Sequence, residues 1–267
     1  MIVIWKKESA RERIEEVAYE MRQYRLLALD LDGTLLNEHG EVSEMNAIWI
    51  KHAIDAGVTV CASTGRGFQG AIPIVERLGL DSPMITVNGG EVWSKPHSLH
   101  KRTTLDSDKV IRLHEVALKH PDVWFWAYST EGLFNKDGWT DDPASKVWLK
   151  FGYYSEELSL LEEILKEIGV WDGLEITNSS PNNIEVNPRG VSKASGLMEL
   201  CRLKGLEMSE IVSVGDSLND IAAIRASGLG VAMGNAQDEV KMVADVITGT
   251  NEEDGVAQVI QQYVLRT

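Results

Sequence analysis

Two aspartates follow the first strongly apolar stretch of the chain. Asp30 and Asp32 stand two residues apart after the run Leu26–Leu29, and Gly33 allows a sharp turn directly behind them. Residues two apart in an extended chain point to the same side, so both carboxylates could face one site. The pair could supply a nucleophile and an acid/base or could hold a metal ion, and an ordinary acidic turn is the alternative.

A second acidic group follows the apolar run 211–214. Asp216 and Asp220 share one helix face if a helix begins near Ser217, and Asn219 adds a neutral oxygen beside them. Hard oxygen ligands on a short connection suit Mg²⁺. An N-cap at Ser217 with acidic residues in the first turn would explain some of these residues but not all of them. The pattern therefore favours a metal site.

Groups that could bind phosphate stand at two further points. Thr64, Gly65 and Arg66 follow the second apolar run and open a helical stretch, where backbone N–H groups and side-chain donors can together satisfy phosphate oxygens. Lys193 follows Ser192, a candidate N-cap, so its ammonium would lie at a helix start. A lone lysine is usually a surface residue, and only its expected position makes this one a candidate.

The stretch after the second run also matches a dinucleotide-binding pattern. Gly65, Gly67 and Gly70 form G-x-G-x-x-G between an apolar run and a helical stretch, with Glu91 about twenty residues further on. Glycines after a strand are common, and this motif would lie on the second strand instead of the first. A dinucleotide-dependent oxidoreductase is therefore the alternative from another functional class.

Short apolar runs alternate with stretches of helical length throughout much of the chain. Near-continuous apolar strands alternating with helices, such as 43–56 and 67–78, indicate a parallel sheet covered on both faces. Ligands of such sheets bind beyond the carboxyl ends of the strands, where all these motifs stand. Asn88 and Gly89 end the third run, as a plain turn or as a polar wall of the same cleft. The expected strands are Leu26–Leu29, Val58–Cys61, Met84–Val87, Ile211–Val214 and Gly230–Met233.

One region interrupts this alternation. Residues 91–184 contain six of the eight tryptophans, and their strand-like stretches alternate less regularly with helices. A segment of different texture between two halves of one pattern indicates an inserted second domain. We expect a Rossmann-like three-layer α/β/α core with a mostly parallel sheet, formed by 1–90 and 185–267, and an inserted α+β domain over 91–184.

The charge of the chain excludes some partners. It has 41 Asp and Glu against 26 Lys and Arg, a formal charge of −15, and a pI of about 4.8. Such a surface repels nucleic acid, whose binding depends on Lys and Arg displacing counterions, and it repels an anionic membrane. The ordinary apolar content, 43%, is enough to form a sizeable core.

The chain reads as a cytoplasmic protein. Cys61 and Cys201 are the only cysteines and lie 140 positions apart, so the sequence indicates no disulfide framework, which favours a reducing compartment. The apolar start of the chain is shorter than a signal peptide needs, and no apolar run reaches about 18 residues. Residues 9–23 fit a short amphipathic helix, so 1–24 is expected to be a helical extension of the core.

In order and position, the strand-end motifs resemble the four motifs of the haloacid dehalogenase superfamily of phosphohydrolases. Further segments are similar to its Cof-type branch, subfamily IIB, which has an α+β cap inserted between the second and third motifs. The resemblance covers about Leu26 to Ile260. The superfamily motifs are matched by Asp30-Leu-Asp-Gly-Thr34, Thr64-Gly-Arg66, Lys193 and Gly215-Asp-Ser-Leu-Asn-Asp220. The Cof-type segments are Asn88-Gly89, Gly190-Val-Ser-Lys193, Ala232-Met-Gly-Asn-Ala236 and Glu253-Asp-Gly-Val256.

The resemblance implies catalytic roles for the matching residues. Asp30 would be the nucleophile that takes the phosphoryl group, and Asp32 would be the general acid/base. Thr64, Gly65 and Lys193 would hold the transferring phosphate. A carboxylate nucleophile is repelled by a phosphate dianion unless cations intervene, so these roles also require a metal ion.

The resemblance also implies the ligands of that metal ion. Asp216, supported by Asn219 or Asp220, would complete a Mg²⁺ site with Asp30 and the backbone carbonyl of Asp32. Mg²⁺ is therefore the expected cofactor.

Together these roles predict a Mg²⁺-dependent phosphatase that hydrolyses a small phosphorylated metabolite through an aspartyl phosphate, a sugar phosphate being one candidate. Arg66, Asn88 and Gly89 are candidates for holding the substrate. A sugar phosphomutase using the same aspartates and a non-enzymatic metabolite-binding regulator are alternatives. No motif in the expected cap identifies the ester, and the oligomeric state is left open.

Overall fold

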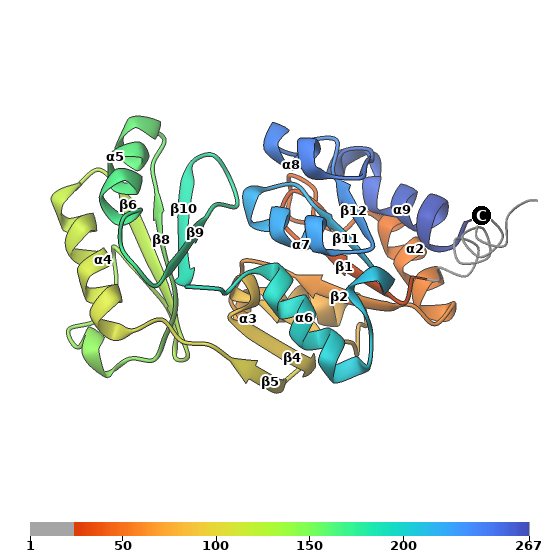
Figure 1. The fold of residues 1–267 in the computed structure, drawn as a ribbon, viewed down its shortest axis with the longest axis horizontal. Coiled ribbons are helices and arrows are strands. Elements are labelled where there is room, and N and C mark those ends of the chain that lie inside the picture. Colours follow the sequence, from red (N-terminus) through yellow and green to blue (C-terminus); the bar gives the residue numbers. More distant parts are fainter. Residues whose placement is uncertain (1–23, 267) are drawn as a thin grey trace, which may run out of the picture.

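The computed structural model describes residues 24–266, which form two β-sheets of different kinds. The larger sheet has eight strands and the smaller has five, and the two lie side by side along the long axis of the molecule (Figure 1). The connections 103–106 and 189–192 join them. We call residues 103–188 the cap and the other described residues the core, and we propose that the two are separate domains.

The core sheet forms from strands that are apolar on both faces. In β1 (Leu26–Leu29), Leu26 and Ala28 pack on one face and Leu27 and Leu29 on the other, all buried. The strand order is β13-β12-β11-β1-β2-β3-β4-β5, parallel up to β3 and antiparallel beyond it. The other core strands are β2 (Thr59–Ser63), β3 (Met84–Thr86), β4 (Glu91–Lys95), β5 (Ser98–Arg102), β11 (Ile211–Gly215), β12 (Leu229–Ala232) and β13 (Val246–Ile247).

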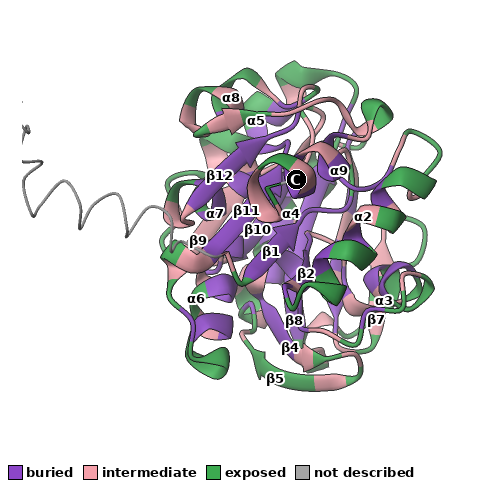
Figure 2. Ribbon diagram, turned by 90° about the vertical axis from the view of Figure 1, so that its right-hand side faces the viewer, coloured by how far each residue is buried: buried purple, intermediate pink, exposed green. Residues whose placement is uncertain are grey.

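Helices cover both faces of the core sheet, so the buried strands lie between helices with exposed outer faces (Figure 2). One face packs against α2 (Glu44–Asp55), α3 (Phe68–Arg77) and α9 (Gly255–Val259). The other face packs against α6 (Lys193–Lys204) and α7 (Ile221–Ala226). No helix within residues 24–266 is long and apolar enough to cross a membrane. The core is completed by α8 (Asp238–Val243) and the π-helical turn Ile260–Val264.

The cap is an antiparallel sheet with two helices on one face. Its strand order is β7-β6-β8-β10-β9, and α4 and α5 lie on the side away from the core (Figure 1). Alternate residues such as Phe125 and Phe151 pack under these helices, which leaves the other face toward the core. The cap elements are α4 (Ser107–Lys119), β6 (Trp124–Ser129), β7 (Gly132–Asn135), β8 (Trp148–Tyr154), α5 (Leu158–Ile168), β9 (Leu174–Thr177) and β10 (Asn183–Pro188).

The expected core elements are found within one or two residues, but the expected limits of the insertion differ from the structure. Residues 91–102, assigned to the inserted domain, form β4 and β5 of the core sheet. Residues 185–188, assigned to the core, complete β10 of the cap. An antiparallel hairpin at a sheet edge has the same pattern of apolar and polar residues as the antiparallel cap strands, so composition did not mark the boundary between core and cap. The helix expected over 9–23 lies outside the described residues.

Candidate functional site

The carboxyl ends of β1 and β11 carry a cluster of three carboxylates. These parallel strands are neighbours, and the sheet order reverses between them, which is where open sheets form binding crevices. Asp30 follows β1, Asp216 and Asp220 follow β11, and one oxygen of each lies within 4.8 Å of the others. The ammonium of Lys193, the first residue of α6, lies 2.6 Å from Asp30 and 2.7 Å from Asp220. Asp30, Asp216 and Asp220, three of the expected metal ligands, therefore lie together beside Lys193.

The loop after β11 is shaped to present Asp216. Asp220 accepts the backbone N–H groups of Asp216 and Ser217 at 3.1 and 3.2 Å, which closes the loop. Thr34 donates its hydroxyl to Asp216 at 3.0 Å. Gly33 has φ of 76°, and a Cβ there would lie 2.5 Å from Asp216 Oδ2. Because its oxygens bind Lys193 and the backbone, Asp220 supports the site more than it offers a free ligand atom.

Burial and like charges destabilise the ionised carboxylates of this cluster. Burial raises the pKa of Asp30 well above its usual range; Lys193 opposes this, whereas Asp220 and Asp216 add to it. Burial and Asp220 raise the pKa of Asp216 to about 6. Burial acts to lower the pKa of Lys193, but Asp220 and Asp30 raise it above its ordinary value. Three carboxylates around one ammonium form an electrostatic environment that a divalent cation would stabilise.

Asp32 lies apart from the carboxylate cluster. Its side chain is 51% exposed and forms a two-point ion pair with Arg66, at 2.7 Å from Nε and 2.5 Å from Nη2. Arg66 also donates its backbone N–H to the buried Thr64 hydroxyl at 3.1 Å. The structure thus places Arg66, an expected substrate ligand, against the carboxylate of the expected acid/base.

A left-handed turn after β3 positions Asn88. Val87, Asn88 and Gly89 have φ of 55°, 57° and 97°, a conformation that a β-branched residue rarely adopts. The N–H of Asn88 donates to the carbonyl of Thr64 at 3.0 Å, which ties the turn to the loop after β2. A Cβ on Gly89 would lie 2.2 Å from the carbonyl oxygen of Ser192. Asn88 therefore lies against the loop after β2, whereas Gly89 packs against the start of α6.

Two charged side chains of the cap sheet reach the core beside this turn. Lys150 on β8 and Glu185 on β10 are almost fully buried, with Nζ and Oε1 2.5 Å apart. Lys150 also donates to the carbonyl of Gly65 at 3.0 Å, and Asn88 donates to Glu185 at 2.7 Å. Burial lowers the pKa of Lys150 against the attraction of Glu185, whose own pKa is held down by Lys150 despite burial. This buried ion pair connects the cap to the phosphate-binding loop expected after β2.

The loop between β9 and β10 directly contacts the loop after β11, which carries Asp216 and Asp220. The N–H of Asn219 donates to the carbonyl of Asn178 at 3.0 Å, and Ser217 donates its hydroxyl to the carbonyl of Ser179 at 3.0 Å. The Asn219 amide also donates to Asn88 Oδ1 at 3.2 Å. The oxygen of the same amide, Asn219 Oδ1, is buried with no hydrogen-bond partner among residues 24–266. An unpaired oxygen beside the carboxylates is compatible with its expected role as a ligand.

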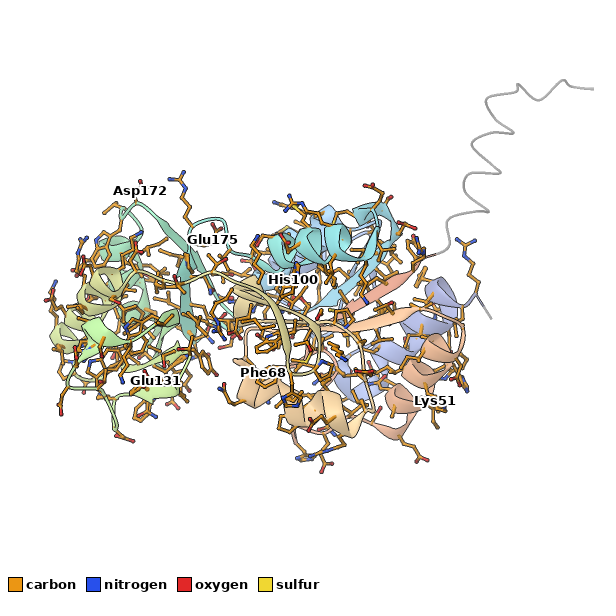
Figure 3. The ribbon with its side chains drawn as sticks, turned by 90° about the horizontal axis from the view of Figure 1, so that it is seen from below. Lys51, Phe68, His100, Glu131, Asp172 and Glu175 are labelled. Atoms are coloured by element: carbon orange, nitrogen blue, oxygen red, sulfur yellow. The ribbon has the colours of Figure 1, made fainter. Side chains whose placement is uncertain are left out.

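These groups enclose a cavity of about 180 Å³ between cap and core. Asp30 and Asp32 line it from the core, and Trp126, Tyr128 and Lys150 line it from the cap. Glu175 and Phe68 mark the cap and core sides of this junction in Figure 3. The cavity therefore lies where a small molecule would contact the expected nucleophile and the cap together.

The sequence analysis missed the cap residues that line the cavity, among them Trp126, Tyr128, Lys150 and Glu185. A usable signal was present, because Lys150 and Glu185 are isolated charges inside strands that are otherwise almost wholly buried. Trp126 and Tyr128 alternate with residues of the cap core, which places them on the opposite face. Nothing in the sequence indicated that this face would meet the motifs of the core.

The dinucleotide-binding alternative lacks the geometry it needs. Gly65, Gly67 and Gly70 do follow a strand and open a helix, but side chains from the cap cover this loop. A Cβ on Gly67 would lie 2.9 Å from the ring of Tyr128. Glu91, the residue expected to bind a ribose, is buried and accepts hydrogen bonds from Thr86 and Arg102. Both of its carboxylate oxygens are already hydrogen-bonded within the core.

Comparisons with known proteins agree with the motifs. The family model described as haloacid dehalogenase-like hydrolase matches residues 27–260. The chain is 43% identical over 241 residues to the 5-amino-6-(5-phospho-D-ribitylamino)uracil phosphatase YcsE of Bacillus subtilis strain 168, covering 90% of this chain and 96% of that protein. A solved haloacid dehalogenase-like hydrolase from Bacillus subtilis has a TM-score of 0.81 at 25% identity, with 90% and 99% of the two chains covered.

The fold is also that of a solved sugar phosphatase of haloacid dehalogenase subclass IIB. The TM-score is 0.79 at 23% identity, with 90% of this chain and 98% of that chain covered. The expected fold class, a mostly parallel α/β core with an α+β cap, is confirmed by this likeness and by the two sheets. The chain belongs to the haloacid dehalogenase-like hydrolase family, as its strand-end motifs predicted.

Proposed function

We propose that this protein is a phosphatase that hydrolyses a small phosphate monoester through an aspartyl phosphate on Asp30. The observation that carries the proposal is the position of Asp30, a buried carboxylate at the carboxyl end of β1. It lies 2.6 Å from the Lys193 ammonium and borders the cavity. In the first step an Asp30 oxygen attacks phosphorus and the ester oxygen leaves; in the second, water releases inorganic phosphate and regenerates the carboxylate.

Asp32 fits the acid/base role in both steps. It would give a proton to the leaving ester oxygen and then take one from the attacking water. Its half-exposed carboxylate can exchange protons with solvent, unlike the buried Asp30. Arg66 fixes its orientation through the two-point ion pair, so we assign Arg66 as a positioning residue.

The phosphate group is proposed to bind between the loop after β2 and Lys193. The Thr64 hydroxyl accepts one hydrogen bond and keeps its own proton for a phosphate oxygen. The N–H of Gly65 and the Lys193 ammonium would supply further donors. Such donors, held before the reaction begins, stabilise the charge that develops in the transition state.

Mg²⁺ is the cofactor that we propose for the carboxylate cluster. Members of this family generally use it, and the donor set fits, because Asp30, Asp216 and the unpaired Asn219 Oδ1 are hard oxygen ligands. The backbone carbonyl of Asp32 is a further proposed ligand, and Asp220 supports the others. When bound, Mg²⁺ would offset the repulsion between Asp30 and the phosphate dianion.

The relatives suggest which ester to test first. The curated relative from Bacillus subtilis is named as a phosphatase of 5-amino-6-(5-phospho-D-ribitylamino)uracil, a phosphorylated polyol attached to a ring. We propose this ester as the first candidate substrate, followed by sugar phosphates. The cytoplasmic location expected from the sequence stays a prediction.

The test is hydrolysis of a generic aryl phosphate by wild type and by Asp30→Asn, each with and without EDTA. We expect hydrolysis that needs Mg²⁺ and falls by at least about 10³-fold in the variant, since the nucleophile is lost. Phosphorus NMR of the products separates release of inorganic phosphate from transfer to a second hydroxyl. Retained activity in a folded Asp30→Asn variant would contradict the mechanism.

A further inference from the structure

The cap face that covers the cavity combines aromatic and charged side chains in one register. β6, β8 and β10 are neighbours, and Trp126 lies opposite Gly152, which lies opposite Glu185. Tyr128 lies opposite Lys150 one step along the same face. Because the other face packs under α4 and α5, this is the face that a bound molecule contacts.

The Lys150 ammonium has three protons, and the structure accounts for two. One points to Glu185, with Nζ and Oε1 2.5 Å apart, and one to the carbonyl of Gly65 at 3.0 Å. The third has no partner among residues 24–266, although Lys150 borders the cavity together with Asp30. A buried ammonium with an unused proton is a strong donor for an oxygen of a bound molecule.

Glu185 holds this ammonium in place. Besides Lys150 it accepts the hydroxyl of Ser179 at 3.0 Å and the amide of Asn88 at 2.7 Å, so most of its lone pairs are used. These bonds link the carboxylate to cap and core at once. Glu185 is therefore a positioning residue, and Lys150 is the group left to contact a ligand.

The charges around the cavity leave no cation for a second acidic group. Among the described residues of the site, three cations face five carboxylates, and each cation is already paired. The pairs are Arg66 with Asp32, Lys150 with Glu185, and Lys193 with both Asp30 and Asp220. A divalent cation and a phosphate dianion bring equal and opposite charge, so they leave this balance unchanged. The group attached to the phosphate should therefore carry no negative charge.

Trp126 provides a flat apolar wall beside Lys150. Its indole lies on Gly152, where a Cβ would be 2.3 Å from Cζ2, so the ring is held against the sheet. An aromatic face next to a buried hydrogen-bond donor suits a chain of alternating C–H and O–H groups.

We propose that Lys150 selects the substrate class by donating a hydrogen bond to a hydroxyl oxygen of a neutral polyol leaving group that lies along Trp126. The inference rests on the proposed phosphatase function and adds to it the residue that recognises the leaving group. The substrate is the monophosphate of a polyol, either free or attached to a larger neutral group.

The experiment compares kcat/KM for D-ribitol 5-phosphate and for n-pentyl phosphate, which has the same carbon chain without hydroxyl groups. Wild type should prefer the ribitol ester by about 10- to 100-fold, the worth of a hydrogen bond to a charged donor. Lys150→Met should reduce this preference to within about threefold. Equal loss on both esters would overturn the proposal, because it would give Lys150 a purely structural role.

Two further variants keep the test decisive. Lys150→Met leaves the Glu185 charge buried without a partner, so the double variant Lys150→Met/Glu185→Gln, neutral at both positions, should show the same loss of preference. Lys119→Met, a matched change at an exposed lysine of α4, should keep the wild-type preference. A double variant that folds and still prefers the ribitol ester overturns the proposal.

The wild type separates this inference from the proposed function on which it rests. If the wild type hydrolyses neither of the two esters, the proposed phosphatase function is contradicted. Equal hydrolysis of both contradicts the role of Lys150 alone. Glycerol 3-phosphate should be hydrolysed at least about tenfold faster than 3-phosphoglycerate, which carries a carboxylate instead of a terminal hydroxymethyl group. Equal rates on that pair would overturn the neutral leaving group.

Discussion

The floor and the roof of the cavity are built in opposite ways. The floor, formed by Asp30, Asp216, Asp220 and Lys193, has three carboxylates around one buried ammonium. The roof, the cap face with Trp126, Tyr128, Lys150 and Glu185, is neutral overall and partly aromatic. An excess of charge suits chemistry common to every phosphate monoester, whereas balanced charges and a flat ring suit the recognition of one class.

This division predicts two patterns of loss. A change in the floor should lower activity on every ester by a similar factor, because it acts on the phosphoryl group. A change in the roof should act mainly on esters whose leaving group contacts the cap. Each prediction below could break this division or sharpen it.

Lys193→Met should have the largest effect. The variant removes the cation that lies between Asp30 and Asp220, so kcat should fall by at least about 10³-fold on both pentyl and ribitol phosphate. The loss of a buried charge partner should also lower the free energy of unfolding, measured by urea denaturation. Lys204→Met, at the exposed end of the same helix, is the matched control. Unequal loss on the two esters would break the division.

Arg66→Met should have a smaller effect that depends on the leaving group. Without its ion pair Asp32 is less well oriented, so we expect about 10- to 100-fold loss of kcat on n-pentyl phosphate. The loss should be smaller on p-nitrophenyl phosphate, whose leaving group departs without a proton. Arg66→Lys should restore little, because an ammonium cannot form the two-point contact. The same loss on both esters would contradict a role through Asp32.

The floor could be predicted from the sequence, whereas the assembly of the roof residues over the core could not. Asp30, Lys193 and Asp216 stand at the ends of apolar runs, and the carboxyl ends of neighbouring parallel strands must meet. The sequence does not state which residues on an antiparallel sheet will face the core, because Lys150 and Glu185 come from separate strands. Their pairing depends on the register of β6, β8 and β10. The same limit explains the misplaced hairpin β4–β5.

The left-handed turn at Val87 also could not be predicted from the sequence. A β-branched residue with φ of 55° contradicts its own preference and is held there by neighbouring loops. Asn88 was named as a substrate ligand, but the structure gives it contacts with Glu185 and Asn219. Tertiary contacts of this kind determine where a side chain lies, and the local sequence pattern does not contain them.

Gly152→Ala tests the roof without changing any charge. A Cβ there would lie 2.3 Å from the Trp126 indole, so the ring must move and unfolding should become easier by about 1–3 kcal/mol. The KM for ribitol phosphate should rise more than that for pentyl phosphate. Gly138→Ala is the control, because a Cβ there has only one contact within 4 Å, at 3.9 Å from Asn135. Wild-type stability and KM in Gly152→Ala would contradict the placement of the indole.

The smallest effect concerns the charge of the floor in protein treated with EDTA. Burial and Asp220 raise the pKa of Asp216 from 3.8 to about 6, so the folded protein binds this proton more tightly than the unfolded chain. The contribution of Asp216 to stability should therefore rise as pH falls through about 6 and be complete below its unfolded value. Glu185 in the roof acts in the opposite sense, because its lowered pKa makes its contribution fall in acid. The free energy of unfolding of wild type and of Asp216→Asn, measured by urea denaturation from below pH 4 to above pH 6, isolates the contribution of Asp216. If the two proteins depend on pH in the same way, Asp216 makes no such contribution.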